Sequence, residues 1–324
     1  MTHIARRRLR AMGTDVHLIL LGGPDPGRIL SDLLSRVEDL EARWSRFLEG
    51  SEISALRQLG DSGGGTMAVS EDVVLLIECG VEAWRMTGGR FDATVDVAAL
   101  GYDRPYLDLV RCGRIAVPVS PIGPPRHHRC QGSGALVVDR VAGTVTVPSG
   151  VCFDPGGIGK GLAADLLVDQ AMESGCAGAC VNLGGDLRVE GEAPDSEGWV
   201  IEVSDPFAPP PDPADDKGIP KGMATIDLLQ GAVATSTPLR RRWLQDGEAR
   251  HHLVDPATGR PGTSDLAAVT VVAGEAWLAE ALATATWLAG IASLDDLPEH
   301  QACGLAVTKD GGLVVGAGMG RFLL

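Results

Sequence analysis

The sequence has little positive charge, no long apolar run and no C-x-x-C pair of cysteines. Its 324 residues carry 28 Lys and Arg against 43 Asp and Glu, which gives a formal net charge of −15. Nothing in such a chain offsets the repulsion of phosphate backbones or anionic lipid, so general binding to nucleic acid or to a membrane surface is disfavoured. Any phosphate must instead be held locally, by glycine turns, a few cations and a divalent metal.

The cysteines and the N-terminus indicate a compartment. Seven cysteines, an odd number, are scattered without a C-x-x-C pair, which disfavours a disulfide framework or a zinc site. Residues 1–12 are basic but lack an apolar segment with a cleavage site, and the first apolar run, Val16–Leu21, has six residues. We therefore expect a cytoplasmic protein without a signal peptide, a membrane anchor or a transmembrane helix.

The hydrophobic pattern predicts an interleaved fold. Hydrophobic residues make up 44% of the chain, enough for a sizeable core. Helical periodicity is strongest over residues 28–43, 71–86, 160–173 and 275–288. Short turns join most neighbouring strands, which favours an α+β fold with mixed, largely antiparallel sheets and packed helices. We expect one domain over residues 1–324, with loop insertions at 117–134 and 206–222.

A glycine-rich stretch, Asp154–Gly161, joins a predicted strand (144–153) to a predicted helix. A turn of this kind exposes unpaired backbone N–H groups at the positive end of a helix dipole, where phosphate binds. The spacing matches neither G-x-x-x-x-G-K-[ST] nor G-x-G-x-x-G. Taken alone, the stretch is about equally well explained as a plain strand-to-helix turn.

Two further short motifs are weak by themselves. The segment Asn182–Asp186 is a two-glycine turn between apolar strands, and a simple hairpin explains it at least as well as a ligand-binding turn. The segment Phe91–Thr94 follows a Gly-Gly helix stop, and Asp92 could be only an N-cap. Each becomes a candidate for a binding rim only if other motifs converge on it.

Proton transfer and metal binding have separate candidates. His252 lies three residues before Asp255, and a carboxylate near a histidine can fix its tautomer for proton transfer. An exposed loop is the alternative, and composition does not separate His252 from His251. Glu280 and Thr284 are four residues apart on one helix, so they share a face that could hold a hard cation. On spacing alone, a solvent-facing Glu280 is the more common arrangement.

Together, in order, these motifs resemble the family of ApbE-type FAD:protein FMN transferases, from Met12 to about Gly290. Eight motifs carry the resemblance: Met12-Gly13-Thr14, Ser45-x-Phe47 with Ser51–Ser54, Gly88–Asp92 with Thr94, Asp154–Gly161 with Asp165, Asn182-x-Gly184-Gly185-Asp186, Ala234-Thr235-Ser236, His252-x-x-Asp255-Pro256-x-Thr258-Gly259 and Glu280-x-x-x-Thr284.

The resemblance implies roles for individual residues. FAD, the substrate, would be lined by Met12, Phe47, Arg90, Phe91, Asp92, Asp154, Lys160 and Leu253. Magnesium would be held by the backbone oxygen of Gly157 and the side chains of Glu280 and Thr284. His252 and Asp255 would assist catalysis. The implied partner is an acceptor protein with a Thr or Ser flavinylation site, with no nucleic acid and no membrane anchor.

The sequence also departs from the family pattern. Glu280 stands where the family usually has Asp, Phe47 where it usually has Tyr, and Thr237 where it usually has Gly. Many members are exported, whereas no export signal is evident here. We expect a Mg²⁺-dependent FAD:protein FMN transferase that releases AMP. The alternatives are an FAD pyrophosphatase, which gives FMN and AMP, and a non-catalytic protein that binds or delivers flavin.

Overall fold

A computed structural model describes residues 4–106, 132–194, 197–208, 222–245 and 248–324. An eight-stranded sheet forms its centre, in the order β1-β2-β6-β7-β10-β15-β16-β17. Every hydrogen-bonded pair in it is antiparallel. Its strands are β1 (Ile4–Ala11), β2 (Thr14–Leu21), β6 (Gly178–Leu183), β7 (Asp186–Gly191), β10 (Gly231–Ser236), β15 (Leu266–Ala273), β16 (Cys303–Thr308) and β17 (Leu313–Val315).

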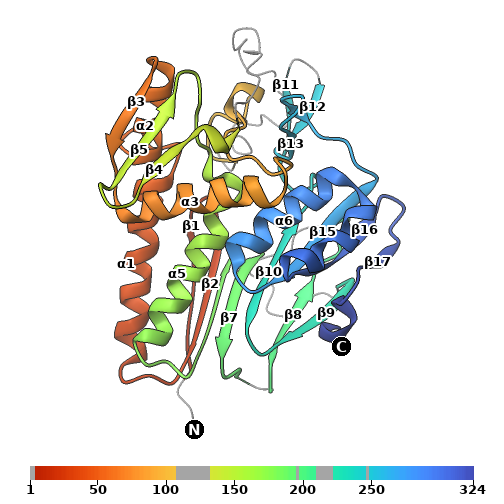
Figure 1. Cartoon of the computed structure of the whole chain (residues 1–324). Coiled ribbons are helices and arrows are strands. Elements are labelled where there is room, and N and C mark those ends of the chain that lie inside the picture. The colour runs from red at the N-terminus through yellow and green to blue at the C-terminus, as the bar shows by residue number, and fades with distance from the viewer. Residues whose placement is uncertain (1–3, 107–131, 195–196, 209–221, 246–247) are drawn as a thin grey trace.

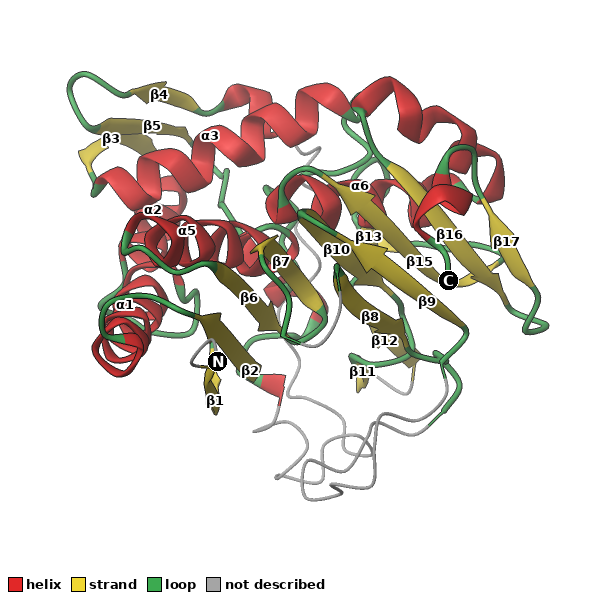
Figure 2. Cartoon of the chain, turned by 90° about the horizontal axis from the view of Figure 1, so that it is seen from below, coloured by secondary structure: helices red, strands yellow, loops and turns green. Residues whose placement is uncertain are grey.

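Three helices cover one face of this sheet, as Figure 1 and Figure 2 show. They are α1 (Pro26–Trp44), α5 (Gly159–Glu173) and α6 (Ala276–Ala289). The predicted apolar stripe of α1 is fully buried, from Ile29 through Leu33 and Val37 to Leu40. Helix α6 is apolar on nearly all sides, as expected for a helix that other elements surround. The buried Glu280 is the charged exception among its buried residues.

A further layer lies outside these helices. It consists of α2 (Glu52–Asp61), α3 (Glu71–Met86) and a small antiparallel sheet of β3 (Gly64–Ala68), β5 (Thr144–Pro148) and β4 (Val137–Asp139). The N-cap of α2 is Ser51, whose hydroxyl accepts a hydrogen bond from Ser54 N at 3.0 Å. The Ser51–Ser54 motif therefore forms the N-terminus of this helix.

The described residues cover the opposite face of the large sheet only in part. An antiparallel ribbon of β8 (Trp199–Val203) and β9 (Ala224–Leu228) packs a second apolar core against β7, β10, β15 and β16. The remaining elements are short: β11 (Arg242–Gln245) with β12 (Glu248–His251), β13 (Val254–Asp255) with β14 (Arg260–Pro261), and the 3-10 helices η1 (Ala98–Leu100), η2 (Ser133–Ala135), η3 (Pro155–Gly157), η4 (Ile291–His300) and η5 (Met319–Phe322).

The α+β class and the predominance of antiparallel pairs are confirmed. Local boundaries differ in three places. The strand predicted over 144–153 ends at Pro148, because Pro148 and Gly150 interrupt the ladder. Strand β1 was not anticipated, since the three consecutive arginines Arg6–Arg8 break the alternation of apolar and polar residues. Gly64 and Gly65 begin β3, although this glycine-rich segment has no strand pattern.

The predicted insertions fall largely outside the described residues. Of the range 117–134, the structure describes only the end, where Ser133 is fully buried. Of the range 206–222, positions 209–221 are not described. The single-domain assignment and both insertions therefore stay predictions. Among the described residues, no helix has the length and hydropathy needed to cross a membrane.

Candidate active site

Two hairpin turns lie side by side at one end of the large sheet. Met12 and Gly13 form the turn between β1 and β2 with φ of 51° and 70°, the left-handed pair typical of a two-residue hairpin. Gly184 and Gly185 form the turn between β6 and β7. Gly184 N donates to Asp15 O at 2.9 Å, so the first residues of β2 hold the second turn in place.

The glycine-rich stretch meets the Phe91–Thr94 segment. The Asp154 carboxylate accepts from Gly156 N at 2.9 Å and forms an ion pair with Arg46 Nε at 3.2 Å. Asp154 N donates to Ala93 O at 2.6 Å. A Cβ on Gly157 would lie 3.0 Å from the Phe91 ring, so glycine allows the ring and the turn to approach.

Helices α5 and α6 touch where the predicted metal ligand lies. A Cβ on Gly161 would lie 2.3 Å from Ala276 O, so only glycine permits this contact. Three hydrogen bonds from Ala276 N and Trp277 N to the Asp165 carboxylate, at 2.8–3.0 Å, fix the start of α6 on α5. Glu280, one turn further along α6, then accepts from Gly161 N at 2.8 Å.

A charge cluster forms at this contact. The Lys160 ammonium pairs with both the Asp186 and the Glu280 carboxylates, which are 5% and 4% exposed. Burial alone would lower the pKa of Lys160, but the two carboxylates outweigh it and raise that pKa. Burial, reinforced by Asp186 and opposed by Lys160, raises the pKa of Glu280. Two buried acids share one base, so the cluster has room for further positive charge.

Thr284 completes the polar face of α6. Its hydroxyl lies 2.9 Å from Ser236 Oγ at the end of β10. Glu280 and Thr284 thus lie on one face, as their spacing predicts, and the solvent-facing alternative for Glu280 is wrong. No group of three or more His, Cys, Asp or Glu able to hold a metal occurs in the described part of the chain. Any cation here would depend on mixed oxygen donors.

Asp92 is buried by a different set of partners. Its Oδ1 accepts from Thr94 N and Oγ1 at 2.8 and 2.7 Å. The same oxygen accepts from Ser133 N and Oγ at 3.1 and 2.7 Å. Asp92 therefore joins two loops rather than capping a helix. Its neighbour Arg90 is exposed, and Phe91 is buried against the turn.

The histidine loop folds back as the short β13–β14 pair. The Asp255 carboxylate accepts from Ala257 N and Thr258 Oγ1, both at 2.9 Å, so it closes its own turn. His251 Nε2 lies 3.2 Å from Gly262 O, and its ring packs edge-on against Trp287. Leu253 is 3% exposed and belongs to the main core.

His252 has one ring nitrogen without a partner. Its Nδ1 is buried and forms no hydrogen bond with the part of the chain that the structure describes. Burial, together with the nearby Arg241, lowers the pKa of His252 to about 3, so the imidazole is neutral at pH 7. A neutral, unpaired ring nitrogen can accept a proton from a ligand.

Aromatic residues that the motifs did not single out surround Phe47. The Arg46 guanidinium lies over the Phe47 ring at 4.3 Å and the Tyr102 ring at 4.7 Å. Tyr102 in turn stacks on Trp243 at 5.3 Å. Arg46 stands inside the Ser45-x-Phe47 motif, whereas Tyr102 and Trp243 lie far along the chain, and no sequence signal connects them.

The family model that matches this chain is the ApbE family, over residues 12–308. This chain is a member of the ApbE family. Its curated relatives include the FAD:protein FMN transferases of Vibrio cholerae, 25% identical over 86% of this chain and 79% of the relative, and of Haemophilus influenzae, 23% identical over 94% and 87%.

Solved structures agree with the fold. The ApbE protein of Thermotoga maritima has a TM-score of 0.79 at 26% identity and covers 99% of both chains. The flavin transferase ApbE of Vibrio cholerae has a TM-score of 0.78 at 20% identity over the full length of both. The α+β architecture is therefore that of the ApbE proteins.

The departures from the ApbE pattern are accommodated locally. Thr237 replaces a glycine, and its hydroxyl donates to Ala267 O at 2.8 Å while accepting from Leu239 N at 3.2 Å. Phe47 loses a hydroxyl but keeps an aromatic face against Arg46. Glu280 reaches Lys160 and Gly161 N across the contact between α5 and α6.

Proposed function

We propose that this ApbE protein is a Mg²⁺-dependent FAD:protein FMN transferase, which moves FMN from FAD to a Thr or Ser hydroxyl of an acceptor protein and releases AMP. The names of its relatives support the reaction. The observation that carries the proposal is the convergence of the glycine-rich turn, Lys160, Glu280 and Thr284 beside the two hairpin turns.

The proposed FAD site is polar at the pyrophosphate and apolar at the ring. FAD carries two negative charges at its pyrophosphate, which the Lys160 ammonium and the N–H groups of the Pro155–Gly157 turn are suited to bind. The Met12–Gly13 turn, Phe91 and Asp92 line the rim, with exposed Arg90 beside them. Phe47 is the proposed aromatic contact of the flavin. Leu253 supports this wall from the core.

The proposed transfer makes one bond and breaks one. The acceptor hydroxyl oxygen bonds to the phosphorus of FMN as the phosphorus–oxygen bond to AMP breaks. The hydroxyl proton goes to His252, whose unpaired Nδ1 is free to take it. The negative charge of bound FAD favours the protonated imidazole, which offsets the low pKa of His252 in the free protein. Asp255 holds the turn that follows this histidine.

Magnesium is proposed on the chemistry of its donors. The Glu280 carboxylate, the Thr284 hydroxyl and the Gly157 carbonyl are all oxygen ligands, which suit this hard cation. The excess of one buried carboxylate over Lys160 favours an added positive charge at the same place. When bound, magnesium would neutralise non-bridging phosphate oxygens and assist departure of AMP.

One assay separates the transferase from its alternatives. Purified protein, FAD and Mg²⁺ are incubated with and without candidate acceptor proteins, and flavin fluorescence of the acceptor band is measured in a denaturing gel. Acceptor labelling with AMP release is the expected result. FMN and AMP without labelling would replace the proposal by an FAD pyrophosphatase. Bound FAD without any turnover would leave a flavin-binding or delivery protein.

The paired histidines give a matched test of the proposed base. His252→Ala should reduce transfer by about 10²–10⁴-fold, the usual contribution of a general base, while FAD binding measured by flavin fluorescence persists. His251→Ala is the control: its Nδ1 also has no partner among the described residues, but its Nε2 lies 3.2 Å from Gly262 O and its ring packs against Trp287. Equal losses in the two variants would show that the loop, not a base, is required.

The compartment and the partners are also proposals. A cytoplasmic location is supported by the free thiols of Cys79, Cys152, Cys176 and Cys303, which are buried among the described residues. The acceptor is proposed to carry its Thr or Ser on an exposed segment that reaches the two hairpin turns.

A further inference from the structure

A basic groove lies on the part of the large sheet that no described helix or strand covers. It has a volume of about 680 Å³ and lies on the face opposite α1, α5 and α6. We call it the basic groove and define it by six of its lining residues: Arg6, Arg8, His17, Ile19, Pro194 and Trp199. None of the described residues that line it is acidic, in a chain with 43 acids.

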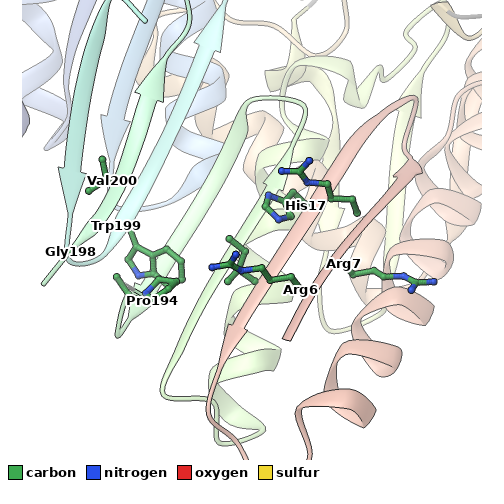
Figure 3. Close-up of a pocket in the computed structure, with 10 residues that line it drawn as sticks. Arg6, Arg7, His17, Pro194, Gly198, Trp199 and Val200 are labelled. Carbon is green, nitrogen blue, oxygen red and sulfur yellow. The ribbon is translucent and has the colours of Figure 1, made fainter. Parts of the chain in front are cut away.

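The register of β1 and β2 places the basic side chains together. Arg6 pairs with Ile19 and Arg8 with His17, so alternation puts all four on one face. Val16, Leu18 and Leu20 occupy the other face of β2 and are buried under the helices. In Figure 3, Arg6 and His17 extend from the sheet toward the segment with Pro194 and Trp199, whereas Arg7 points away.

Within the described part of the chain, the side chains of Arg6 and Arg8 have no ion-pair partner. Arg10 pairs with Asp15 at 2.8 Å, but neither Arg6 nor Arg8 forms an ion pair with any residue that the structure describes. The wall opposite them is fixed, because Trp199 Nε1 donates to Gly191 O at 3.1 Å. Asp227 lies behind Gly198 but does not line the groove. Two exposed guanidinium groups therefore face a rigid apolar wall.

Positive charges lie close together in the groove. Burial is the largest cause that lowers the pKa of His17, and the charges of Arg8 and then Arg6 lower it further. Elsewhere the net charge of −15 repels acidic molecules. Four of the 28 basic residues fall within positions 6–10, so this strand is where an acidic partner meets attraction.

We propose that the basic groove docks an extended, acidic segment of a protein partner. Arg6 and Arg8 are two residues apart on one strand, which separates their Cα atoms by about 7 Å. Carboxylates at alternate positions of an extended segment have the same spacing and the same orientation. The apolar wall of Ile19, Pro194 and Trp199 suits the other side chains of such a segment better than it suits a free inorganic anion.

The groove leads toward the proposed active site. From Arg8, β1 continues for three residues to Ala11 and then turns at Met12, about 13 Å away along the strand. A segment held over Arg6 and Arg8 would leave its neighbouring residues near the Met12–Gly13 turn. Identification of the partner with the flavin acceptor rests on the proposed function, whereas the docking itself does not.

A labelled peptide of ten alternating Glu and Thr residues tests the docking without FAD. Its fluorescence anisotropy is followed at low ionic strength with the wild type, with Arg6→Glu/Arg8→Glu and with Arg28→Glu/Arg321→Glu. The last pair changes net charge equally at exposed positions outside the groove. We expect at least a tenfold weaker affinity for the groove variant alone. No binding by the wild type, or equal losses in both variants, would overturn the proposal.

Further measurements exclude other occupants and a folding defect. If tripolyphosphate binds the groove more tightly than the peptide does, the ligand of the groove would be an inorganic anion and not an acidic segment. If the wild type is a dimer and the groove variant is a monomer, the occupant of the groove would be a second copy of the chain instead of an acidic segment. Arg6→Gln/Arg8→Gln, with an unchanged melting temperature, should also weaken the peptide, and full binding by that variant would contradict the proposal.

Once an acceptor protein is identified, the kinetics of the groove variant distinguish docking of the acceptor from transfer of FMN. Arg6→Glu/Arg8→Glu should raise KM for the acceptor about tenfold and leave kcat and FAD affinity unchanged. Unchanged KM together with lost peptide binding would show that the docked partner is not the acceptor. If the wild type does not bind FAD, the proposed function is contradicted. The result of the peptide-binding experiment would be unaffected.

Discussion

Glu280 and Asp92 are both buried carboxylates of the candidate site, but they are held by opposite means. Glu280 shares the Lys160 ammonium with Asp186 and takes one backbone N–H, so its neighbourhood holds more negative than positive charge. Asp92 is surrounded by neutral donors from Thr94 and Ser133, all on one oxygen. The first arrangement favours an added cation, whereas the second favours a fixed junction between two loops.

The largest effect that tests this difference between Glu280 and Asp92 is expected on the rate of FMN transfer. Glu280→Gln keeps the shape of the side chain and an acceptor for Gly161 N but removes the negative charge. We expect transfer to fall by about 10²–10³-fold, the loss typical of a preorganised electrostatic group. The Mg²⁺ concentration at half-maximal rate should rise, measured by acceptor fluorescence over a Mg²⁺ titration.

Asp186→Asn is the matched control for that variant. It removes the other negative neighbour of Lys160 and leaves the three proposed oxygen ligands untouched. Its Mg²⁺ dependence should therefore resemble that of the wild type. A Glu280→Gln protein with normal transfer at every Mg²⁺ concentration would remove Glu280 from the proposed metal site.

The second effect is on stability. Asp92→Ala removes four hydrogen bonds and leaves the O–H of the fully buried Ser133 without an acceptor, although its oxygen still accepts from Ala93 N, so we expect the free energy of unfolding to fall by about 2–4 kcal/mol. Asp92→Asn keeps an oxygen at the Oδ1 position and should lose about 1 kcal/mol or less. Urea unfolding followed by tryptophan fluorescence measures both.

The same pair tests whether Asp92 also contacts FAD. All four hydrogen bonds end on Oδ1, which leaves Oδ2 without a partner among the described residues. If Oδ2 binds FAD, Asp92→Asn should fold normally and bind FAD more weakly. Normal FAD affinity in Asp92→Asn would make Asp92 a purely structural junction.

The sequence predicted the polar motifs better than it predicted the hydrogen-bond partners of the motif residues. Helical period and capping placed Glu280 and Thr284 on one face, and turn chemistry predicted the hairpin at Gly184–Gly185, because both depend on local spacing. The partners Ser133 and Ser236 could not be assigned, since the hydrogen bonds from Ser133 to Asp92 and from Ser236 to Thr284 span 41 and 48 residues.

The aromatic wall and β1 were missed for related reasons. Tyr102 and Trp243 stack across the chain without any shared motif. The arginines of β1 hide its alternation, because an edge strand with one open face tolerates charge where a buried strand does not. Local patterns therefore give elements and motifs, whereas contacts between distant segments decide which motif residues are bonded to each other.

The third effect concerns Asp165, a carboxylate held by backbone donors at the start of α6 and by an ion pair with Arg188 Nε at 3.6 Å. Asp165→Ala removes three hydrogen bonds at a helix N-terminus and should cost about 1–3 kcal/mol. Because α6 carries Glu280 and Thr284, transfer should fall as well, even at temperatures where the variant is folded. Asp165→Asn, which keeps one acceptor, should lie between the wild type and Asp165→Ala in urea unfolding. Unchanged stability in Asp165→Ala would show that packing alone positions α6.

The smallest effect is expected for Asp72, a partly exposed carboxylate paired with Arg36 at 2.6 Å and Arg43 at 2.7 Å. The hydrogen bonds from Arg36 lower the pKa of Asp72 below its ordinary 3.8, and Arg36 and Arg43 also lower it by charge. Such a group stabilises the fold fully above its unfolded pKa, and the contribution is lost as pH falls through the lower, folded pKa.

Asp72→Asn should therefore destabilise the protein by about 1 kcal/mol or less at pH 7, since both arginines are partly exposed to solvent. The difference from the wild type should shrink as the pH falls below 4, where the wild-type carboxylate becomes protonated too. Urea midpoints measured across this range check the sign. The exposed pair of Glu82 with Arg85 is the control, and Glu82→Gln should leave the midpoint unchanged at every pH. If the difference in urea midpoint between the wild type and Asp72→Asn grows toward low pH, the protonated form of Asp72 stabilises the fold more than the charged form does. The carboxylate–arginine pairing at Asp72 would then not act through charge, unlike the pairing at Glu280.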